Sequence, residues 1–366
     1  MAQLFIHKEY SKMSSELDPS VSGVAIDRKK VRSSVISLLR GFFSSPTIAA
    51  LAELGMIERM LAGPFGVEDF PMAVDKRVLS SVFLYLHSLN LLKEMPEGGY
   101  GLTREGRTAL KRSGAFLLLF SYKGYFENLS ALLTGESKAV TVDRRRNVLG
   151  SGSLHSKKFF PAVWEMLHAA RPSALIDVGC GDGQFLTDAC IQWPNVSIAA
   201  VDLSPIAVET TLKQLETFGR KDVVGIVNSG VNVAEWVAHL PEELKVASPL
   251  VVSMWFVVHE FSGGDPKTVI RFFHEVSSAL PKADIILGEI NALSPELLAE
   301  HHESSIMPEL LFFHGLSRQG VLTWEVWHRV LNEIPYSLIG ERQFDLVGEV
   351  EEQTTPSSFV WHLRPK

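Results

Sequence analysis

This chain of 366 residues has few cysteines, no net positive charge and no long uninterrupted apolar run. Its two cysteines, Cys180 and Cys190, are too few for a disulfide framework and fit a reducing compartment. Asp and Glu (42) outnumber Lys and Arg (35), so the net charge of −7 gives no general attraction to nucleic acid or to an anionic membrane.

The beginning of the chain has no basic segment followed by a long apolar stretch, so we expect no secretory signal. No uninterrupted apolar run approaches the roughly 18 residues that a membrane-spanning helix requires. The sequence therefore predicts a soluble cytoplasmic protein that binds neither nucleic acid nor a membrane.

The chain does have ample hydrophobic sequence, 46% of its residues, which at this length is enough for two or three domains. We expect an N-terminal arm over 1–30, a winged-helix dimerisation domain over 31–115, a helical linker over 116–170 that roofs a pocket, and a catalytic α/β domain over 171–366.

The winged-helix prediction rests on the order of elements in 31–115. Three helical patterns come first, and the stretch SSPT (44–47) predicts a break between the first two helices. A hairpin turning at Gly98 and Gly99 follows, and Thr103 is expected to cap the next helix.

A winged helix can bind DNA or join two subunits. DNA binding needs a basic recognition helix, but the third helical pattern (75–92) carries only Lys76 and Arg77 before it turns apolar. We therefore expect a homodimer formed through this domain. A regulator that senses a small molecule stays open as an alternative of another class.

From residue 172 the pattern alternates strand, loop and helix. Apolar strands are predicted at ALIDVG (174–179), SIAAVDL (197–203), VVGIV (223–227), PLVVSMWFVV (249–258) and ADIILGEI (283–290). Alternation of this length is typical of a parallel, doubly wound, Rossmann-like sheet.

The strongest motif follows the first of these strands. It has an acid at the strand end and three glycines at alternate positions, before a helix: Asp177, Gly179, Gly181 and Gly183. Glycines let the backbone approach a ligand closely, and the G-x-G-x-G spacing differs from the dinucleotide G-x-G-x-x-G. Asp177 can accept hydrogen bonds from an ammonium group, and Asp202, at the end of the second strand, can accept them from ribose hydroxyls.

On these residues the chain resembles the class I S-adenosylmethionine-dependent methyltransferases over about residues 30–362. More narrowly, it resembles the two-domain O-methyltransferases that dimerise through a winged helix. The resemblance implies S-adenosylmethionine as cofactor, with Asp177 and the three glycines at its methionine end and Asp202 at its ribose. Asn232 or Ser229 would replace an acid that the family usually places near the adenine.

The segment VVHEF takes the place of the family's His-Asp-Trp, so the resemblance implies that His259 is the general base and that Glu260 stands for the Asp. Glu289, which ends the next strand, would orient the base. In the family, a further Glu and an Arg come just before the Thr that opens the last helix. Here Val321 and Leu322 occupy those positions, and an additional histidine, His314, lies nearby.

Two imidazoles that converge on a cleft make an open catalytic metal site. This departure is similar to the α-keto acid C-methyltransferases of antibiotic biosynthesis, which implies Fe or Zn bound by His259 and His314. The substrate would be a keto acid such as 2-ketoarginine or phenylpyruvate. An O-methyltransferase with His259 as base and Glu289 orienting it stays open.

A keto acid carries a carboxylate, which an arginine can bind. Arg144 is the chosen candidate, with Arg145 and Arg146 beside it, and His302 and Phe313 are expected to line the pocket. The guanidinium of a ketoarginine-like substrate would need an acid, for which the candidates are Glu300, Glu303 and Glu309. An aromatic substrate would instead use Phe312 and Phe313.

Overall fold

The computed structural model describes residues 28–136, 140–155, 159–168, 171–300, 306–344 and 356–366. The chain forms two compact units, Met1–Ser45 and Pro46–Lys366. The boundary falls inside the first described helix, α2 (Arg28–Glu53). The four segments expected from the sequence stay a prediction.

Helix α2 runs through the position where a break was predicted. The expectation that SSPT separates two helices is wrong, because Pro46 lies inside the helix. A proline removes one backbone hydrogen bond and can kink a helix without ending it.

The last 19 residues of α2 are apolar on average, although Arg40 and three serines interrupt the apolar run. The stretch Val35–Glu53 has a mean hydropathy of 1.4 over a span long enough to cross a membrane, and only 17% of that window is buried. One such helix is weak evidence for a span, because core helices of soluble proteins and N-terminal signal sequences pass the same test.

The remainder of the N-terminal helical region begins the second unit and follows the predicted order. Its elements are α3 (Met56–Ala62), η1 (Val67–Asp69), α4 (Lys76–Ser88), β1 (Leu92–Glu94), β2 (Tyr100–Leu102) and α5 (Arg104–Lys111). Strands β1 and β2 are antiparallel, and the turn between them uses Gly98 and Gly99 at φ of 94° and 77°. The Thr103 hydroxyl accepts a hydrogen bond from the backbone N–H of Gly106 at 3.0 Å, as a helix cap does.

A series of helices connects this region to the sheet. They are α6 (Ser113–Ser121), α7 (Lys123–Glu127), α8 (Leu129–Leu133), α9 (Arg144–His155) and α10 (Phe160–Leu167). Helices α6 and α9 pack so closely that a Cβ on Gly150 would lie 2.5 Å from the backbone nitrogen of Leu118.

The seven-stranded sheet has the order β5-β4-β3-β6-β7-β9-β8. Its strands are β3 (Ala174–Val178), β4 (Ser197–Asp202), β5 (Val224–Val227), β6 (Leu250–Trp255), β7 (Ala283–Ile290), β8 (Tyr336–Phe344) and β9 (Ser358–Pro365). The five predicted strands are parallel, which confirms the predicted α/β class, while β9 and β8 add an antiparallel edge.

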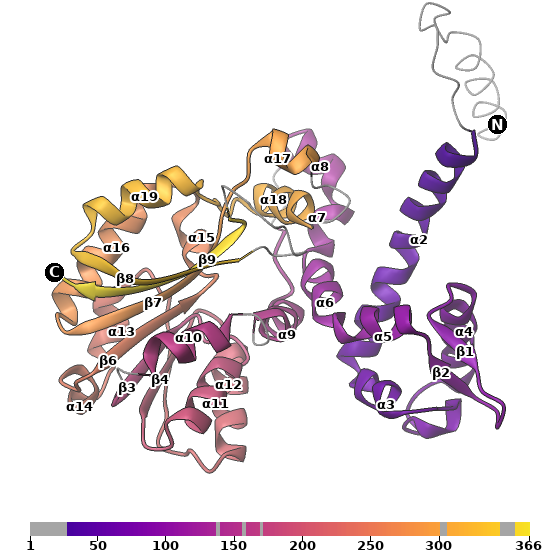
Figure 1. Ribbon diagram of the computed structural model, residues 1–366, viewed down its shortest axis with the longest axis horizontal. Coiled ribbons are helices and arrows are strands. Elements are labelled where there is room, and N and C mark those ends of the chain that lie inside the picture. The colour runs from indigo at the N-terminus through magenta and orange to yellow at the C-terminus, as the bar shows by residue number, and fades with distance from the viewer. Residues whose placement is uncertain (1–27, 137–139, 156–158, 169–170, 301–305, 345–355) are drawn as a thin grey trace, which may run out of the picture. The chain divides into compact units, whose positions relative to one another are not determined.

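Helices cover both faces of the sheet (Figure 1). One face packs against α10, α11 (Gln184–Gln192) and α12 (Pro205–Thr217) through a core that includes Leu175, Phe185 and Val251. The other packs against α13 (Val233–Ala238), α16 (Pro266–Ala279) and α19 (Trp324–Glu333). Strand residues alternate between the two cores, as in a sheet buried on both faces.

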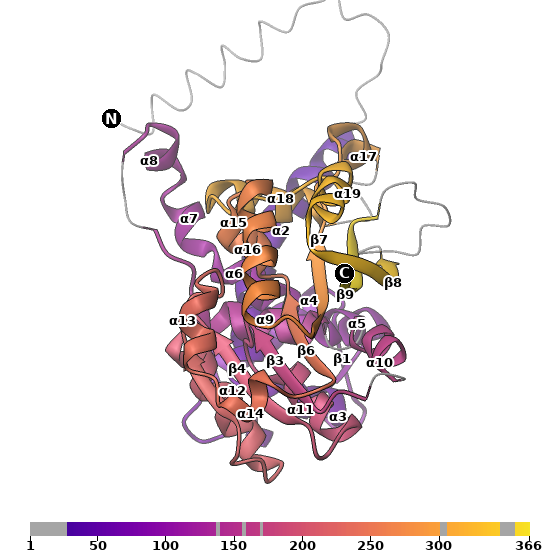
Figure 2. The same cartoon turned by 90° about the vertical axis from the view of Figure 1, so that its left-hand side faces the viewer.

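The remaining helices are α14 (Glu242–Lys245), α15 (Val258–Ser262), α17 (Pro295–Glu300) and α18 (Met307–Leu316). Helix α15 follows β6 directly, and α17 and α18 follow β7. In Figures 1 and 2, α15 and α18 lie near each other beyond the carboxyl ends of these strands. Ligands of open α/β sheets bind at this edge.

Candidate active site

The glycine loop joins β3 to α11 in a conformation that requires glycine. Gly179, Gly181 and Gly183 have φ of 81°, 57° and 78°, values that residues with a Cβ rarely adopt. A Cβ on Gly183 would also lie 2.9 Å from Cα of Thr211. The loop therefore brings bare backbone to the sheet edge, as predicted for a cofactor loop.

Asp177 is buried at the end of β3, where its carboxylate accepts a hydrogen bond of 2.6 Å from the Ser253 hydroxyl. Burial raises the pKa of Asp177 to about 7, against the Ser253 hydrogen bond and with help from the charges of Asp202 and Asp182. A buried carboxyl without a cation partner suits the ammonium group of a ligand.

Asp202, at the end of β4, holds the glycine loop from the other side. Its carboxylate accepts hydrogen bonds from the backbone N–H of Gly181 at 3.1 Å and of Ser204 at 2.8 Å. Burial raises the pKa of Asp202, although both N–H groups oppose that shift.

Asn232 is exposed at the start of α13, and its side-chain amide donates to the Glu235 carboxylate at 3.3 Å. Asn228 donates to the same Glu235 oxygen at 3.0 Å. The side-chain oxygen of Asn228 is buried without a hydrogen-bond partner, and the residue directly follows β5. Because Asn228 directly follows a predicted strand, it could have been identified from the sequence, where we predicted Asn232 or Ser229 instead.

His259 lies in the first turn of α15 and is held by Glu289 from β7. Nδ1 of His259 lies 2.9 Å from Oε2 of Glu289, and the same carboxylate accepts from the backbone N–H of Val258 at 2.8 Å. Both side chains are buried, with 5% of His259 and none of Glu289 exposed. A carboxylate facing Nδ1 assigns the proton to Nδ1 and leaves Nε2 to face the site.

Burial alone lowers the pKa of His259, but the charge and the hydrogen bond of Glu289 outweigh it, so the pKa is raised overall. The variant Glu289→Gln is therefore expected to lower this pKa, because burial then acts without the opposing charge. An NMR titration of the imidazole signals would measure it, with exposed His239 as an internal control. An unchanged His259 pKa would contradict the pairing.

His314, from α18, faces His259. The two ring centroids are 4.7 Å apart with planes at 76°, and only 5% of His314 is exposed. Nδ1 of His314 is buried without a hydrogen bond of ordinary geometry. Burial and the charge of His259 lower the pKa of His314 to about 2, although the nearby Leu310 carbonyl acts weakly in the other direction. The ring is therefore neutral and able to donate a lone pair.

The loop after α18 fixes the two histidines relative to each other. The backbone N–H of Gln319 donates to the His314 carbonyl at 2.9 Å, and that of Gly320 donates to the His259 carbonyl at 3.1 Å. Gly320 packs directly on the backbone of Gly263 and Gly264. This connection places residues 55 positions apart in the sequence side by side.

Arg144 begins α9 and forms an ion pair with Glu260. Its guanidinium donates to the two carboxylate oxygens at 3.0 and 3.2 Å. The carboxylate that contacts His259 is Glu289, the residue expected to orient it, whereas Glu260 pairs with Arg144. Burial works against the charge of Arg144, but Glu260 keeps its pKa above the ordinary value. Of the neighbouring arginines, Arg145 is exposed and Arg146 pairs with Glu53 and Asp143.

The other predicted pocket residues are placed differently. Phe313 is buried and packs on Tyr122, with ring centroids 4.1 Å apart. Phe312 and Glu309 are exposed. His302 and Glu303 lie outside the described residues, as does the side chain of Glu300.

Two residues of this region were missed by sequence reasoning. The Tyr122 hydroxyl donates to the Gln319 side-chain oxygen at 3.1 Å, and burial raises the pKa of Tyr122. Tyr122 stands 197 positions from Gln319, so no local pattern could have joined them.

Within the described ranges, no three side chains of His, Cys, Asp or Glu are grouped to hold a metal ion. His259 and His314 fit a metal as a pair, because both side chains are buried, their ring centroids lie 4.7 Å apart and the His314 ring is neutral. Two imidazoles leave positions for oxygen atoms of a substrate or water.

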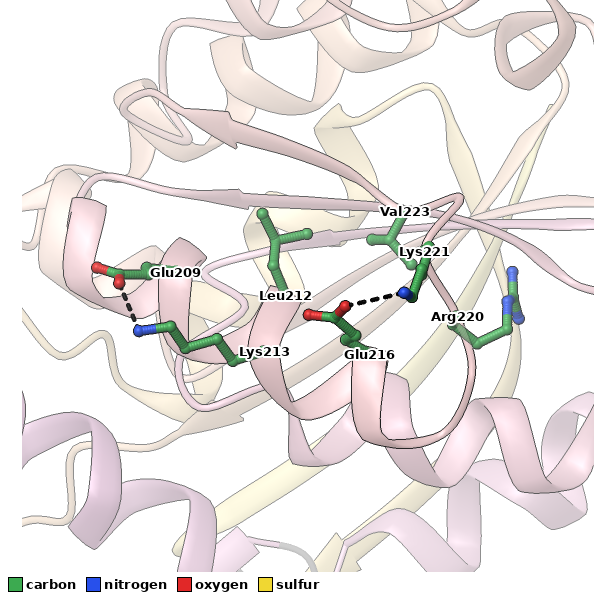
Figure 3. Close-up of a pocket in the computed structure, with 7 residues that line it drawn as sticks. All are labelled: Glu209, Leu212, Lys213, Glu216, Arg220, Lys221 and Val223. Atoms are coloured by element: carbon green, nitrogen blue, oxygen red, sulfur yellow. Dashed lines mark hydrogen bonds and ion pairs between the residues drawn. The ribbon is translucent and has the colours of Figure 1, made fainter.

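A separate pocket of about 310 Å³ lies on the surface around α12 (Figure 3). Two ion pairs, Lys213 with Glu209 and Lys221 with Glu216, cross its lining. None of the candidate residues lines it, so it is distinct from the site described above.

Comparison with solved structures identifies the fold. Human N-acetylserotonin methyltransferase in complex with S-adenosylmethionine superposes with a TM-score of 0.61 at 15% identity, over 93% of this chain and 99% of that one. The mitomycin 7-O-methyltransferase MmcR superposes with a TM-score of 0.57 at 12% identity, over the same shares of the two chains. The chain has the class I O-methyltransferase fold.

No family model matches the sequence. The 2-ketoarginine methyltransferase of Streptomyces arginensis is 29% identical over 176 residues, 47% of this chain and 51% of that protein. The malonyl-[acyl-carrier protein] O-methyltransferase of Paenibacillus sp. (strain JDR-2) is 26% identical over 177 residues, 45% of this chain and 55% of that protein. The chain thus spans about half the length of the curated relatives it matches.

Proposed function

We propose that this protein is a cytoplasmic methyltransferase that transfers the methyl group of S-adenosylmethionine to the carbon next to the ketone of a small α-keto acid. The observation that carries this proposal is the pairing of buried His259 with a second, neutral imidazole, His314. The similarity to a 2-ketoarginine methyltransferase supports it.

The cofactor would be held by the residues of the β3 and β4 strand ends. Asp177 would accept from the ammonium group of its methionine part and Asp202 from the ribose hydroxyls, while the glycine loop contacts the cofactor with backbone only. Pairing with the ammonium group would stabilise the ionised carboxylate of Asp177, which burial by itself disfavours.

A metal ion such as Fe or Zn would be held by His259 and His314. When bound, it would polarise the keto oxygen and acidify the neighbouring C–H bond. Glu289 would keep Nδ1 of His259 protonated and its ring oriented, as acidic partners of metal-binding histidines do. Arg144 would bind the substrate carboxylate.

Methyl transfer and metal content of the purified protein test this proposal. We expect a gain of one methyl group on 2-ketoarginine or phenylpyruvate, detected by mass spectrometry, together with about one Fe or Zn per chain. An active protein that contains no metal, or one that methylates hydroxyl groups only, would overturn it.

A second function, O-methylation of a small hydroxylated molecule, is favoured by one observation. Nδ1 of His259 lies 2.9 Å from the Glu289 carboxylate. A general base and a carboxylate that orients it are sufficient to deprotonate a phenol. Under this alternative, His314 would be dispensable for the chemical step.

We also propose that the protein is a homodimer formed through its N-terminal helical region. Apolar side chains of α2 are exposed, including Leu38 (78% exposed) and Phe42 (76%). An exposed apolar face of this kind marks an interaction surface. We expect the double variant Leu38→Glu, Phe42→Glu to shift the mass in sedimentation from dimer to monomer. A monomeric wild-type protein would contradict this.

A further inference from the structure

The ion pair between Arg144 and Glu260 involves the residue that is proposed to bind the substrate carboxylate. Arg144 is the residue assigned to the substrate carboxylate, yet its guanidinium already donates to both oxygens of Glu260 at 3.0 and 3.2 Å. The two side chains are partly accessible, with 40% of Arg144 and 26% of Glu260 exposed. Both hydrogen bonds come from one nitrogen, Nη1, so a carboxylate ligand that binds this edge of the guanidinium competes with Glu260.

Glu260 directly follows His259, a proposed metal ligand, in helix α15. Its carboxylate pairs with Arg144, the residue proposed to bind the substrate carboxylate. In the present arrangement Arg144 engages both of its oxygen atoms.

We infer that the substrate carboxylate takes the place of Glu260 on Arg144, and that the released Glu260 is the general base that removes the C3 proton of the keto acid. This inference rests on the proposed function. Arg144 keeps one carboxylate partner throughout, and the released Glu260, 26% exposed, remains accessible to water. It also restricts the active base to the state in which substrate is present.

Proton removal and methyl transfer each break one bond and form another. The C3–H bond breaks, its proton goes to a Glu260 oxygen, and its electron pair forms the C2–C3 double bond while the keto oxygen takes up the charge of the enolate. The enolate carbon then attacks the methyl group of S-adenosylmethionine. The C3–CH₃ bond forms, the S–CH₃ bond breaks, and its electron pair stays on sulfur. Glu260 returns its proton to water.

Neither histidine is free for this task in the proposed site. Nδ1 of His259 is bound to Glu289, and its Nε2 and the His314 ring are assigned to the metal. Glu260 directly follows His259 in the chain, and its carboxylate becomes available once Arg144 changes partner.

Exchange of the C3 protons in D₂O, without S-adenosylmethionine, tests the base directly. The protein as purified is mixed with 2-ketoarginine, and deuterium gain is followed by mass spectrometry at one fixed pD. We expect wild-type protein to accelerate the exchange and Glu260→Gln to lose about 10²-fold or more of that acceleration. Glu260→Asp, which keeps a carboxylate, should restore part of it. Thermal unfolding of each variant shows that it is folded.

The partner exchange has its own signature. The methyl ester of 2-ketoarginine lacks the carboxylate, so wild-type protein should exchange its protons much more slowly than those of the acid. In Arg144→Gln, Glu260 is free in all states, so acid and ester should exchange at similar rates. A structural role of the ion pair would not bring the two rates together.

Failure of the inference and of the proposed function give different results. If wild-type protein methylates the keto acid but Glu260→Gln exchanges its C3 protons at the wild-type rate, the inference is overturned alone. Equal wild-type rates for acid and ester overturn the partner exchange. If wild-type protein neither binds nor methylates a keto acid, the proposed function falls and the inference with it.

Discussion

Asp177→Asn is expected to weaken the binding of S-adenosylmethionine by about 100-fold or more and to make the unliganded protein more stable at alkaline pH. Asp177 is fully buried next to Ser253, and burial raises its pKa to about 7. Asn has the same shape and can keep a hydrogen bond with Ser253, but it cannot pair with an ammonium group. Removing one partner of a buried ion pair costs several kcal/mol, so the affinity should fall by about 100-fold or more.

The effect on stability has the sign expected for an acid whose folded pKa is raised. Between the ordinary value of 3.8 and about 7, the folded protein binds a proton that the unfolded chain has lost, so stability falls as the pH rises through this window. Above it, the ionised Asp177 costs on the order of a few kcal/mol. Asp177→Asn removes that cost at pH 8 and changes little at pH 4.

Thermal unfolding at pH 4 and pH 8, with calorimetric titration of S-adenosylmethionine, measures both effects. Asp222→Asn is a matched control, because the hydrogen bond from Arg220 lowers the pKa of Asp222 and the variant should lose stability at pH 8. Binding of S-adenosylmethionine to Asp177→Asn at near wild-type affinity would contradict the assignment of this residue.

His314→Ala is expected to remove the metal and to reduce keto-acid methylation by at least about 100-fold. His314 is buried, its pKa is lowered to about 2, and its Nδ1 has no hydrogen bond of ordinary geometry. A ring of this kind serves better as a metal ligand than as an acid or base. Losing one of two protein ligands should release the ion, because the remaining imidazole binds it weakly.

Metal analysis and methyl-transfer assays on the same protein samples measure the outcome. Exposed His239 gives the control variant His239→Ala, which should keep both metal and activity. Full activity of His314→Ala without metal would favour O-methylation with His259 and Glu289 alone.

The parallel sheet and the glycine loop could be predicted from the sequence because their signals are local. The motif from Asp177 to Gly183 lies between an apolar strand and a helix, and each glycine takes the positive φ that its position requires. The predicted helix break is wrong, because the local effect of Pro46 does not end the helix, which continues through it.

The partners in the site could be predicted only in part. Glu289 lies at the end of β7, and His259 lies in α15, which follows the neighbouring strand β6, so their meeting follows from the sheet. Arg144 lies 116 positions from Glu260, and Tyr122 meets Gln319 across an even longer separation. Such pairs depend on how α6, α9 and the loop after α18 pack, which no sequence spacing encodes.

The measurement that tests the proposed reaction most directly is NMR of the product formed from S-adenosylmethionine labelled with ¹³C in its methyl group. The purified protein is incubated with 2-ketoarginine and, separately, with phenylpyruvate. We predict a labelled methyl group whose protons couple to a single proton on C3. A labelled methyl group on oxygen, or no transfer to either acid, would contradict carbon methylation of an α-keto acid.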